Sequence, residues 1–142
     1  SIGVCNFTEE FLTKIIDATG VVPSVNQIEL HPYFPQAQMR AFHALHGIQT
    51  ESWSPLGKTE ELRNEKAIID LALSRGVTPA QLILRWHTQL GAIPLPKSAD
   101  RGRQMSNLHS FGFELSLEEL DVISGLERGR LWGGDPNTHE EM

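Results

Sequence analysis

The chain has 142 residues, of which 39% are hydrophobic and 21% charged, and its formal net charge is −6. That length suits one domain with a core of its own, and the composition is typical of globular proteins. No apolar run approaches a membrane span of about 20 residues, no signal-peptide pattern is found, and an acidic protein lacks the basic face that nucleic acid requires. The single cysteine, Cys5, excludes an internal disulfide and a cysteine-based zinc site. We therefore expect a cytoplasmic protein that holds no metal and binds neither membranes nor nucleic acid.

Strand and helix patterns alternate along the chain, beginning with a strand. Four short apolar runs predict strands at Ile2–Asn6, Ser24–Leu30, Ile48–Trp53 and Ala92–Pro96. Capping residues and apolar stripes predict helices from Thr8 to Gly20, Pro35 to Gly47, Leu62 to Arg75, Thr78 to about Leu90, Asp100 to Asn107 and Ser116 to about Leu126. Thr78 and Ser116 each open a capping box, and Met39, Phe42 and Leu45 give the second helix one apolar face. Residues 127–142 are rich in Gly and charge, and we expect a tail or loop there.

Strands that alternate with helices are typical of an α/β fold with parallel strands. The sequence has no G-x-G-x-x-G after its first strand, which disfavours an open dinucleotide-binding sheet and favours a (β/α)₈ barrel. Polar residues also stand at or near the carboxyl ends of the four strands, where barrels gather their functional groups: Asn6, Gln27, Trp53 and Lys97. A complete barrel has eight strands and about 250 residues. We therefore expect residues 1–126 to form the C-terminal half of a TIM barrel.

The segment 92–107 joins the end of an apolar strand to the start of a short helix. A helix amino terminus offers unpaired N–H groups and a positive dipole end to an anion. Lys97, Arg101 and Arg103 add three cations within seven residues of an otherwise acidic chain. This pattern suits a phosphate monoester. The alternative is a solvated basic turn, because the segment matches no Gly-rich phosphate loop.

Four motifs in order resemble the aldo-keto reductases. They read IGVCNF at 2–7, VNQIELHPY at 25–33, WSPLG at 53–57 and PKS at 96–98, the last followed by Arg103 and Asn107. Their order and spacing match the C-terminal half of that family, and the chain is most similar to its bacterial 2,5-diketo-D-gluconate reductases. The resemblance implies half of a TIM barrel from an NADPH-dependent oxidoreductase that reduces aldehydes and ketones by hydride transfer.

The resemblance also assigns residues to the nicotinamide end of the cofactor. Asn6 and Gln27 match the amides that bind the nicotinamide carboxamide, and Trp53 matches the aromatic residue that stacks on the nicotinamide ring. Cys5 replaces the serine that the family usually has beside the amide, and a thiol is a weaker hydrogen-bonding group than a hydroxyl. Alternative interpretations are a helix-capping role for Asn6 and a place in the core for Trp53.

The rest of the cofactor is assigned in the same way. Ser54 and Leu56 match contacts to the pyrophosphate, and Asn107 matches the contact to adenine. Lys97, Ser98 and Arg103 match the clamp on the adenosine 2′-phosphate, which favours NADP(H) over NAD(H). In the family, the glycine-rich tail around Trp132 closes over the substrate, but its motif here is too loose to name a contact.

The catalytic Tyr, Lys, Asp and His of the family come from the other half of the barrel. Tyr33 is the only tyrosine, and its HPY context matches a non-catalytic position. We therefore expect no catalytic residue here: the chain is a fragment that is inactive alone and meets a small carbonyl substrate only with the missing N-terminal half. The alternative is a native, non-catalytic half-barrel that binds NADP(H) or a partner. Its open strand edges predict self-association or pairing with the missing half.

Overall fold

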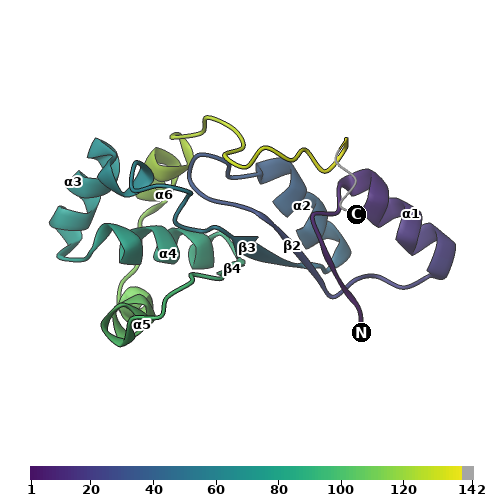
Figure 1. Cartoon of the computed structure of the whole chain (residues 1–142), viewed down its shortest axis with the longest axis horizontal. Helices are drawn as coiled ribbons and strands as arrows, with labels where there is room; N and C mark the ends of the chain where they lie inside the picture. The colour runs from purple at the N-terminus through teal and green to yellow at the C-terminus, as the bar shows by residue number, and fades with distance from the viewer. Residues whose placement is uncertain (139–142) are drawn as a thin grey trace.

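Four parallel strands form one sheet in the order β1-β2-β3-β4 (Figure 1). The computed structural model describes residues 1–138. The strands are β1 Gly3–Cys5, β2 Val25–Glu29, β3 Gln49–Trp53 and β4 Ala92–Pro94. The helices are α1 Glu9–Thr19, α2 Ala37–His46, α3 Lys66–Arg75, α4 Pro79–Gln89, α5 Arg101–Leu108 and α6 Leu117–Ser124, with 3₁₀ turns η1 Leu62–Asn64 and η2 His109–Phe111. The predicted α/β class with four parallel strands is confirmed.

The two faces of the sheet have different surroundings. Ile28 and Ser52 are paired in register and buried, on the face that packs against helices such as α2 and α4. Gln27, Glu51 and Ile93 form the register row on the other face, where Gln27 and Glu51 are half-buried and Ile93 is 46% exposed. Within residues 1–138, β1 and β4 each pair with one strand only. The sheet is therefore open at both edges, and one of its faces is largely uncovered.

The helix boundaries follow the capping residues closely. Thr78 and Ser116 form the predicted capping boxes, and Thr8 and Asp100 accept backbone hydrogen bonds at the starts of α1 and α5. The second helix begins later than predicted, at Ala37 instead of Pro35, because the preceding residue has a left-handed backbone with φ 43°. These signals are local, so the sequence predicts most boundaries to within two residues.

Two predictions within the helices are wrong. In α2, Leu45 is 81% exposed, and the buried residue of that helix is His43. The helix predicted from Leu62 to Arg75 is divided at Glu65, whose side chain accepts from the Tyr33 hydroxyl at 2.6 Å. This contact with a distant part of the chain holds Glu65 outside helical geometry, with ψ 133°.

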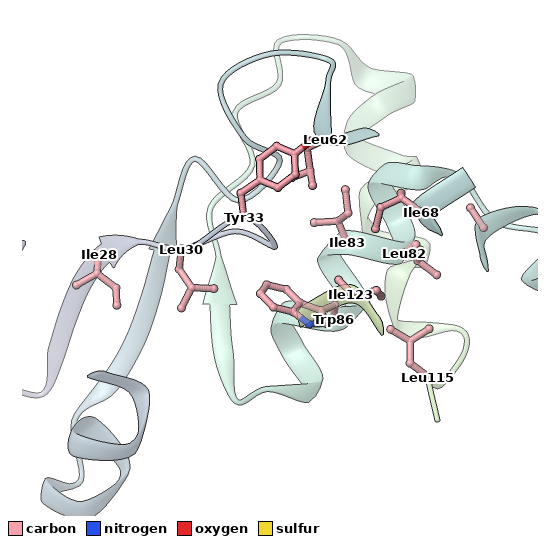
Figure 2. Close-up of a cluster of buried hydrophobic side chains, with 11 residues drawn as sticks. Ile28, Leu30, Tyr33, Leu62, Ile68, Leu82, Ile83, Trp86, Leu115 and Ile123 are labelled. Carbon is pink, nitrogen blue, oxygen red and sulfur yellow. The ribbon is translucent and has the colours of Figure 1, made fainter. Parts of the chain in front are cut away.

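The main core lies between the sheet and helices α3, α4 and α6 (Figure 2). Trp86 of α4 is fully buried, and its indole Nε1–H donates to Ser124 Oγ at 3.0 Å. The buried members of this cluster are Ile28, Leu30, Tyr33, Leu62, Ile68, Ala72, Leu82, Ile83, Trp86, Leu115 and Ile123. The last helix, α6, is thereby fixed against α4, and it also packs against α3.

The segment after α6 runs back across the molecule toward α1 (Figure 1). Within 127–138 it contains no helix or strand, and it is fixed to the loop after β2 by the backbone N–H groups of Arg128 and Gly129, which donate to Tyr33 O at 2.8 Å. Residues 139–142 of the predicted tail lie outside the described residues. The division of the chain at residue 126 stays a prediction.

No single helix in residues 1–138 is long and apolar enough to cross a membrane. By length and composition alone, α3 and α4 would pass as a pair, bent by 91° at their junction.

Candidate functional site

The carboxyl ends of β1 and β3 meet through a side-chain hydrogen bond. The indole Nε1–H of Trp53 donates to Asn6 Oδ1 at 2.8 Å, although the two residues are 47 positions apart. Asn6 also donates its backbone N–H to Gln27 O at 2.9 Å, which fixes it beside β2. Both Asn6 and Ser54 have a left-handed backbone, with φ 56° and 50°. Non-glycine residues in this conformation are uncommon and often lie at functional sites.

Trp53 and Asn6 line a cavity of about 530 Å³, which we call the aromatic pocket. The tail closes one side of it through Trp132, whose ring centroid lies 6.0 Å from that of Trp53. Lys58 places its Nζ 4.6 Å from the centroid of Trp132. The residues that line the pocket are Cys5, Asn6, Phe7, Phe11, Trp53, Arg130, Trp132, Gly133, Gly134 and Pro136.

Six predicted contacts line a second cavity of about 680 Å³, which we call the basic pocket. They are Ser54, Leu56, Lys97, Ser98, Arg103 and Asn107. Lys58 and Arg63 also line it, so four cationic side chains border one cavity of an acidic protein. The two pockets adjoin, because Lys58 lines the basic pocket while its ammonium lies over Trp132 of the aromatic pocket.

His87 supports the turn that carries Ser54 and Leu56. Its Nε2 donates to Pro55 O at 3.0 Å, and its Nδ1 therefore accepts from Ser52 Oγ at 3.1 Å. The imidazole is completely buried in α4, and burial lowers the pKa of His87 to about 3, so the ring is neutral. These contacts give His87 a structural role beneath the turn.

The start of α5 differs from the predicted anion site in one respect. The Asp100 carboxylate accepts from Arg103 N at 2.7 Å and already occupies one of the N–H groups at this helix terminus. Ser98 is held in the same turn, because its Oγ accepts from Asp100 N at 3.2 Å. An anion in the basic pocket would therefore depend mainly on the side chains of Lys97, Ser98 and Arg103, rather than on unpaired helix N–H groups.

Gln27 and Cys5 lie side by side in register but have different surroundings. Gln27 donates its Nε2–H to Glu51 Oε2 at 3.0 Å and lines neither the aromatic nor the basic pocket. Cys5 is exposed and lines the aromatic pocket. The geometry therefore gathers all the predicted site residues into the two adjoining pockets except Gln27.

Glu29 anchors the tail beside the aromatic pocket, a contact that the sequence analysis missed. Its buried carboxylate accepts from the backbone N–H groups of Leu131 and Trp132, at 2.7 and 3.3 Å, and pairs with Arg130 Nη1 at 3.1 Å. Burial by itself raises the pKa of Glu29, but bonds from His31 and Leu131 and the charge of Arg130 hold that pKa below its usual value. A charged residue at the buried end of a strand, two residues before His31, is the signal that could have revealed this anchor.

Tyr33 lines neither the aromatic nor the basic pocket. Its hydroxyl is 2.6 Å from Glu65 Oε1, and the guanidinium of Arg128 lies 4.4 Å from its ring centroid. Burial, together with the hydrogen bond and charge of Glu65, raises the pKa of Tyr33. This hydroxyl is therefore poorly suited to donate a proton to a substrate.

A comparison with known families matches residues 1–128 to the model described as the aldo/keto reductase family. The chain belongs to the aldo/keto reductase family. Among solved structures, a mutant of Gox0644 in complex with NADPH has a TM-score of 0.93 at 49% identity, over 99% of this chain and 52% of that one. The neighbours in this family carry the complete barrel fold, of which the four strands described here correspond to about half.

The chain also covers about half the length of its curated relatives in the aldo/keto reductase family. The 2,5-diketo-D-gluconic acid reductase B of Corynebacterium sp. (strain SHS752001) is 63% identical over 142 residues, which are 100% of this chain and 51% of that protein. The methylglyoxal reductase DkgA of Escherichia coli is 46% identical over 138 residues, 96% of this chain and 50% of that protein. The chain thus spans about half the length of the curated relatives it matches.

Proposed function

We propose that this chain supplies the NADP(H) site of a reductase that acts on aldehydes and ketones. The observation that carries the proposal is the basic pocket, which brings together residues from the turn after β3, the segment after β4 and α5. A dinucleotide with a 2′-phosphate needs such a cavity, with cations at one end and a stacking surface at the other. The NADPH complex of Gox0644, a protein 49% identical to this chain, supports the same cofactor class.

The basic pocket fits the adenosine 2′-phosphate and the pyrophosphate. Arg103 offers a planar fork of donors and Lys97 a compact positive charge, and both suit a phosphate dianion. Ser98 would add a hydroxyl donor on giving up its 3.2 Å bond to Asp100 O, and Asn107 on α5 would contact adenine. The turn at Ser54 and Leu56, held by His87, would carry the pyrophosphate toward the aromatic pocket.

The aromatic pocket fits the nicotinamide. Trp53 would stack on one face of the ring and leave the other face open, while the Asn6 amide binds the carboxamide. When bound, NADPH supplies the hydride that reduces the carbonyl carbon. Gln27 would reach the carboxamide from the neighbouring strand only after giving up its bond to Glu51, so its contribution is the weakest of the assignments.

This chain by itself would not turn over a carbonyl substrate. Reduction needs a proton donor at the carbonyl oxygen, and Tyr33, the only tyrosine, is held by Glu65. A second half-barrel that pairs with the open edges of β1 and β4 would supply the donor and the remaining wall of the substrate pocket. The second candidate is a chain that binds NADP(H) without catalysis, favoured by the cofactor residues that line the two pockets.

The test is a titration of the wild-type chain and two variants with NADPH and with NADH. Binding is measured by the fluorescence of the reduced nicotinamide. Removing the Arg103 side chain (Arg103→Ala) should weaken NADPH binding by about 10-fold or more, the usual effect of one lost charge-assisted phosphate contact, while NADH binding changes little. Arg101→Ala is the matched control, because Arg101 is an exposed cation on the same helix that does not line the basic pocket.

Equal losses for both cofactors would contradict the 2′-phosphate assignment, and equal losses for both variants would indicate a nonspecific charge effect. A turnover assay with NADPH and an aldehyde is run beside the titration. Measurable turnover by the 142-residue chain alone would contradict the location of the chemistry proposed here.

A further inference from the structure

Asn26 and His43 form a fully buried polar pair on the helix-covered face of the sheet. Asn26 lies in β2, and its Nδ2 donates to Nε2 of His43 in α2 at 3.0 Å. Nδ1 of the same imidazole then donates to Thr50 Oγ1 in β3 at 2.8 Å. Buried polar side chains are costly unless their hydrogen bonds are made, and apolar residues would satisfy packing alone. Packing of the core alone therefore does not account for this polar pair.

Asn26 holds the peptide next to Asn6. Its Oδ1 accepts from Phe7 N at 3.3 Å, and its Nδ2 donates to Phe7 O at 2.9 Å. One side-chain amide therefore bonds both the backbone N–H and the backbone carbonyl of Phe7. Asn6 has the left-handed φ of 56°, which few residues other than glycine adopt readily. The two hydrogen bonds to Phe7 fix the backbone immediately after Asn6. They thereby oppose relaxation of Asn6 to an ordinary backbone conformation.

The network continues from Asn6 to the aromatic pocket. Asn6 Oδ1 accepts from Trp53 Nε1, and both side chains line that pocket. An uninterrupted path of hydrogen bonds and one peptide link thus connects a helix on the outside of the sheet with the pocket at its carboxyl edge. Every hydrogen bond on the path has a heavy-atom separation between 2.8 and 3.3 Å.

We infer that Asn26 and His43 are positioning residues for the nicotinamide end of the cofactor site. His43 fixes the orientation of the Asn26 amide, Asn26 fixes the Phe7 peptide, and Asn6 is thereby held against Trp53. Neither Asn26 nor His43 lines the pocket, so both act through Asn6. The inference rests on the proposed function for the identity of the ligand, but the geometry that it concerns exists without the cofactor.

The protonation state of His43 agrees with this role. Burial lowers the pKa of His43 to about 4, so the imidazole is neutral at physiological pH. A neutral ring with its proton on Nδ1, bonded to Thr50, keeps the Nε2 lone pair directed at Asn26.

The first experiment needs no cofactor. The chain has three tryptophans, and the indole N–H of Trp53 reports the bond to Asn6, whereas that of Trp86 reports the bond to Ser124. In His43→Leu, hydrogen exchange at the Trp53 indole should speed up about 10-fold, the effect of losing roughly one hydrogen bond, and the Trp86 indole should not change. His43→Gln should restore slow exchange, because an amide oxygen can accept from Asn26.

Ser124→Ala is the matched control, since it removes a partly buried hydrogen bond to Trp86, a tryptophan that does not line the aromatic pocket. It should accelerate exchange at the Trp86 indole and leave that of Trp53 unchanged. If His43→Leu does not fold, Thr50→Val removes the other partner of His43 and should act in the same direction on Trp53. An unaffected Trp53 indole, or equal acceleration at Trp53 and Trp86, would overturn the inference.

The second experiment separates the two ends of the cofactor by calorimetric titration with NADPH and with 2′,5′-ADP. His43→Leu should weaken NADPH about 10-fold and leave 2′,5′-ADP within about twofold, because the latter lacks the nicotinamide. Parallel losses of both ligands would show a purely structural role and overturn the inference. If the wild-type chain binds neither ligand while the Trp53 indole responds as expected, the positioning of Asn6 is upheld and the proposed cofactor function fails.

Discussion

His43 and His87 are both buried between a helix and the sheet, where His43 bonds Asn26 and Thr50 and His87 bonds Ser52. Each imidazole is fully buried and bonded on both ring nitrogens, and each supports the residue next to a left-handed position, at Asn6 or Ser54. Buried neutral histidines of this kind use contacts between a helix and a strand to fix the backbone conformation at the pocket. They also make the stability of the fold depend on pH.

The stability of the chain should fall as the pH drops below the ordinary histidine pKa of 6.5. Burial lowers the pKa of His43 to about 4 and of His87 to about 3, so between pH 6.5 and 5 the unfolded chain takes up protons that the folded chain does not. Each histidine should then remove about 2 kcal/mol from the free energy of unfolding over this interval. Urea denaturation at the two pH values measures the change.

His87→Gln tests the assignment, since glutamine does not titrate and can still donate to Pro55 O. The variant should lose about half of the stability change between pH 6.5 and 5. A variant with the full wild-type dependence on pH would place the responsible groups elsewhere. Carboxylates with lowered pKa values, such as Glu29 and Glu119, do not interfere, because their contribution is lost only below pH 4.5.

Among the elements, the segment 127–138 matters most for the aromatic pocket, because it carries Trp132. It has no regular hydrogen-bond pattern of its own, and its placement depends on Glu29 at the end of β2 and on the Tyr33 carbonyl. A single carboxylate thus sets where Trp132 stands relative to Trp53. Segments held by few contacts open more readily than core elements, as expected for a wall that admits ligands.

Glu29→Gln should loosen the tail. The amide nitrogen of glutamine would face either the Arg130 donor, at the Oε2 position, or the backbone donors of Leu131 and Trp132, at the Oε1 position, and the charge that pairs with Arg130 is lost. Amide hydrogen exchange at Leu131 and Trp132 should accelerate about 10- to 100-fold, the range expected for a hydrogen bond to a charged group. Exchange in α4, measured in the same spectra, should remain slow.

Glu61→Gln provides the matched comparison at the other end of the segment. Glu61 pairs with Arg128 at 2.9 Å, but its side chain is 65% exposed. Solvent-exposed ion pairs contribute little, so exchange at Leu131 should change by less than about threefold. A larger effect from Glu61→Gln than from Glu29→Gln would show that the tail is not anchored at the sheet.

For the whole molecule, the open edges of the sheet determine whether the chain associates in solution. Among the described residues, β4 has a partner on one side only, and Ile93, Leu95, Leu108 and Phe111 are exposed at or near it. Unpaired strand edges beside apolar side chains promote association. A cavity of about 450 Å³ next to this edge, lined mostly by apolar residues such as Leu84 and Ile93, offers a ready surface for a further element.

The chain should therefore associate with itself when no complementary half-barrel is present. Light scattering after gel filtration should give masses above the 15.9 kDa of one chain, rising with concentration. A lysine at the β4 edge, in Ile93→Lys, should shift the distribution toward the monomer by charge repulsion and loss of apolar contact. Leu73→Lys, at an exposed site on α3 away from the edges, should not. A wild-type chain that is monomeric at all concentrations would contradict the prediction.

The sequence by itself determined the elements and one side of the basic pocket. Caps such as Thr78 and Ser116 act within one helical turn, and the alternation of strands and helices specifies a parallel sheet. Lys97, Ser98, Arg103 and Asn107 fall within eleven residues, so a strand end followed by a helix brings them together. The carboxyl-end rule for parallel strands also placed Asn6 and Trp53 at one edge before their hydrogen bond was seen.

Tertiary structure decided the contacts that connect distant parts of the chain. His43 took the buried place predicted for an apolar stripe in α2, and Gln27 bonded to Glu51 rather than entering the pocket. The bonds from Glu29 to the tail cross more than a hundred residues. Periodicity reports which positions are apolar, but a buried polar residue breaks that pattern, and its partner depends on strand register and on where neighbouring segments pack. Such pairings become visible only once the chain is folded.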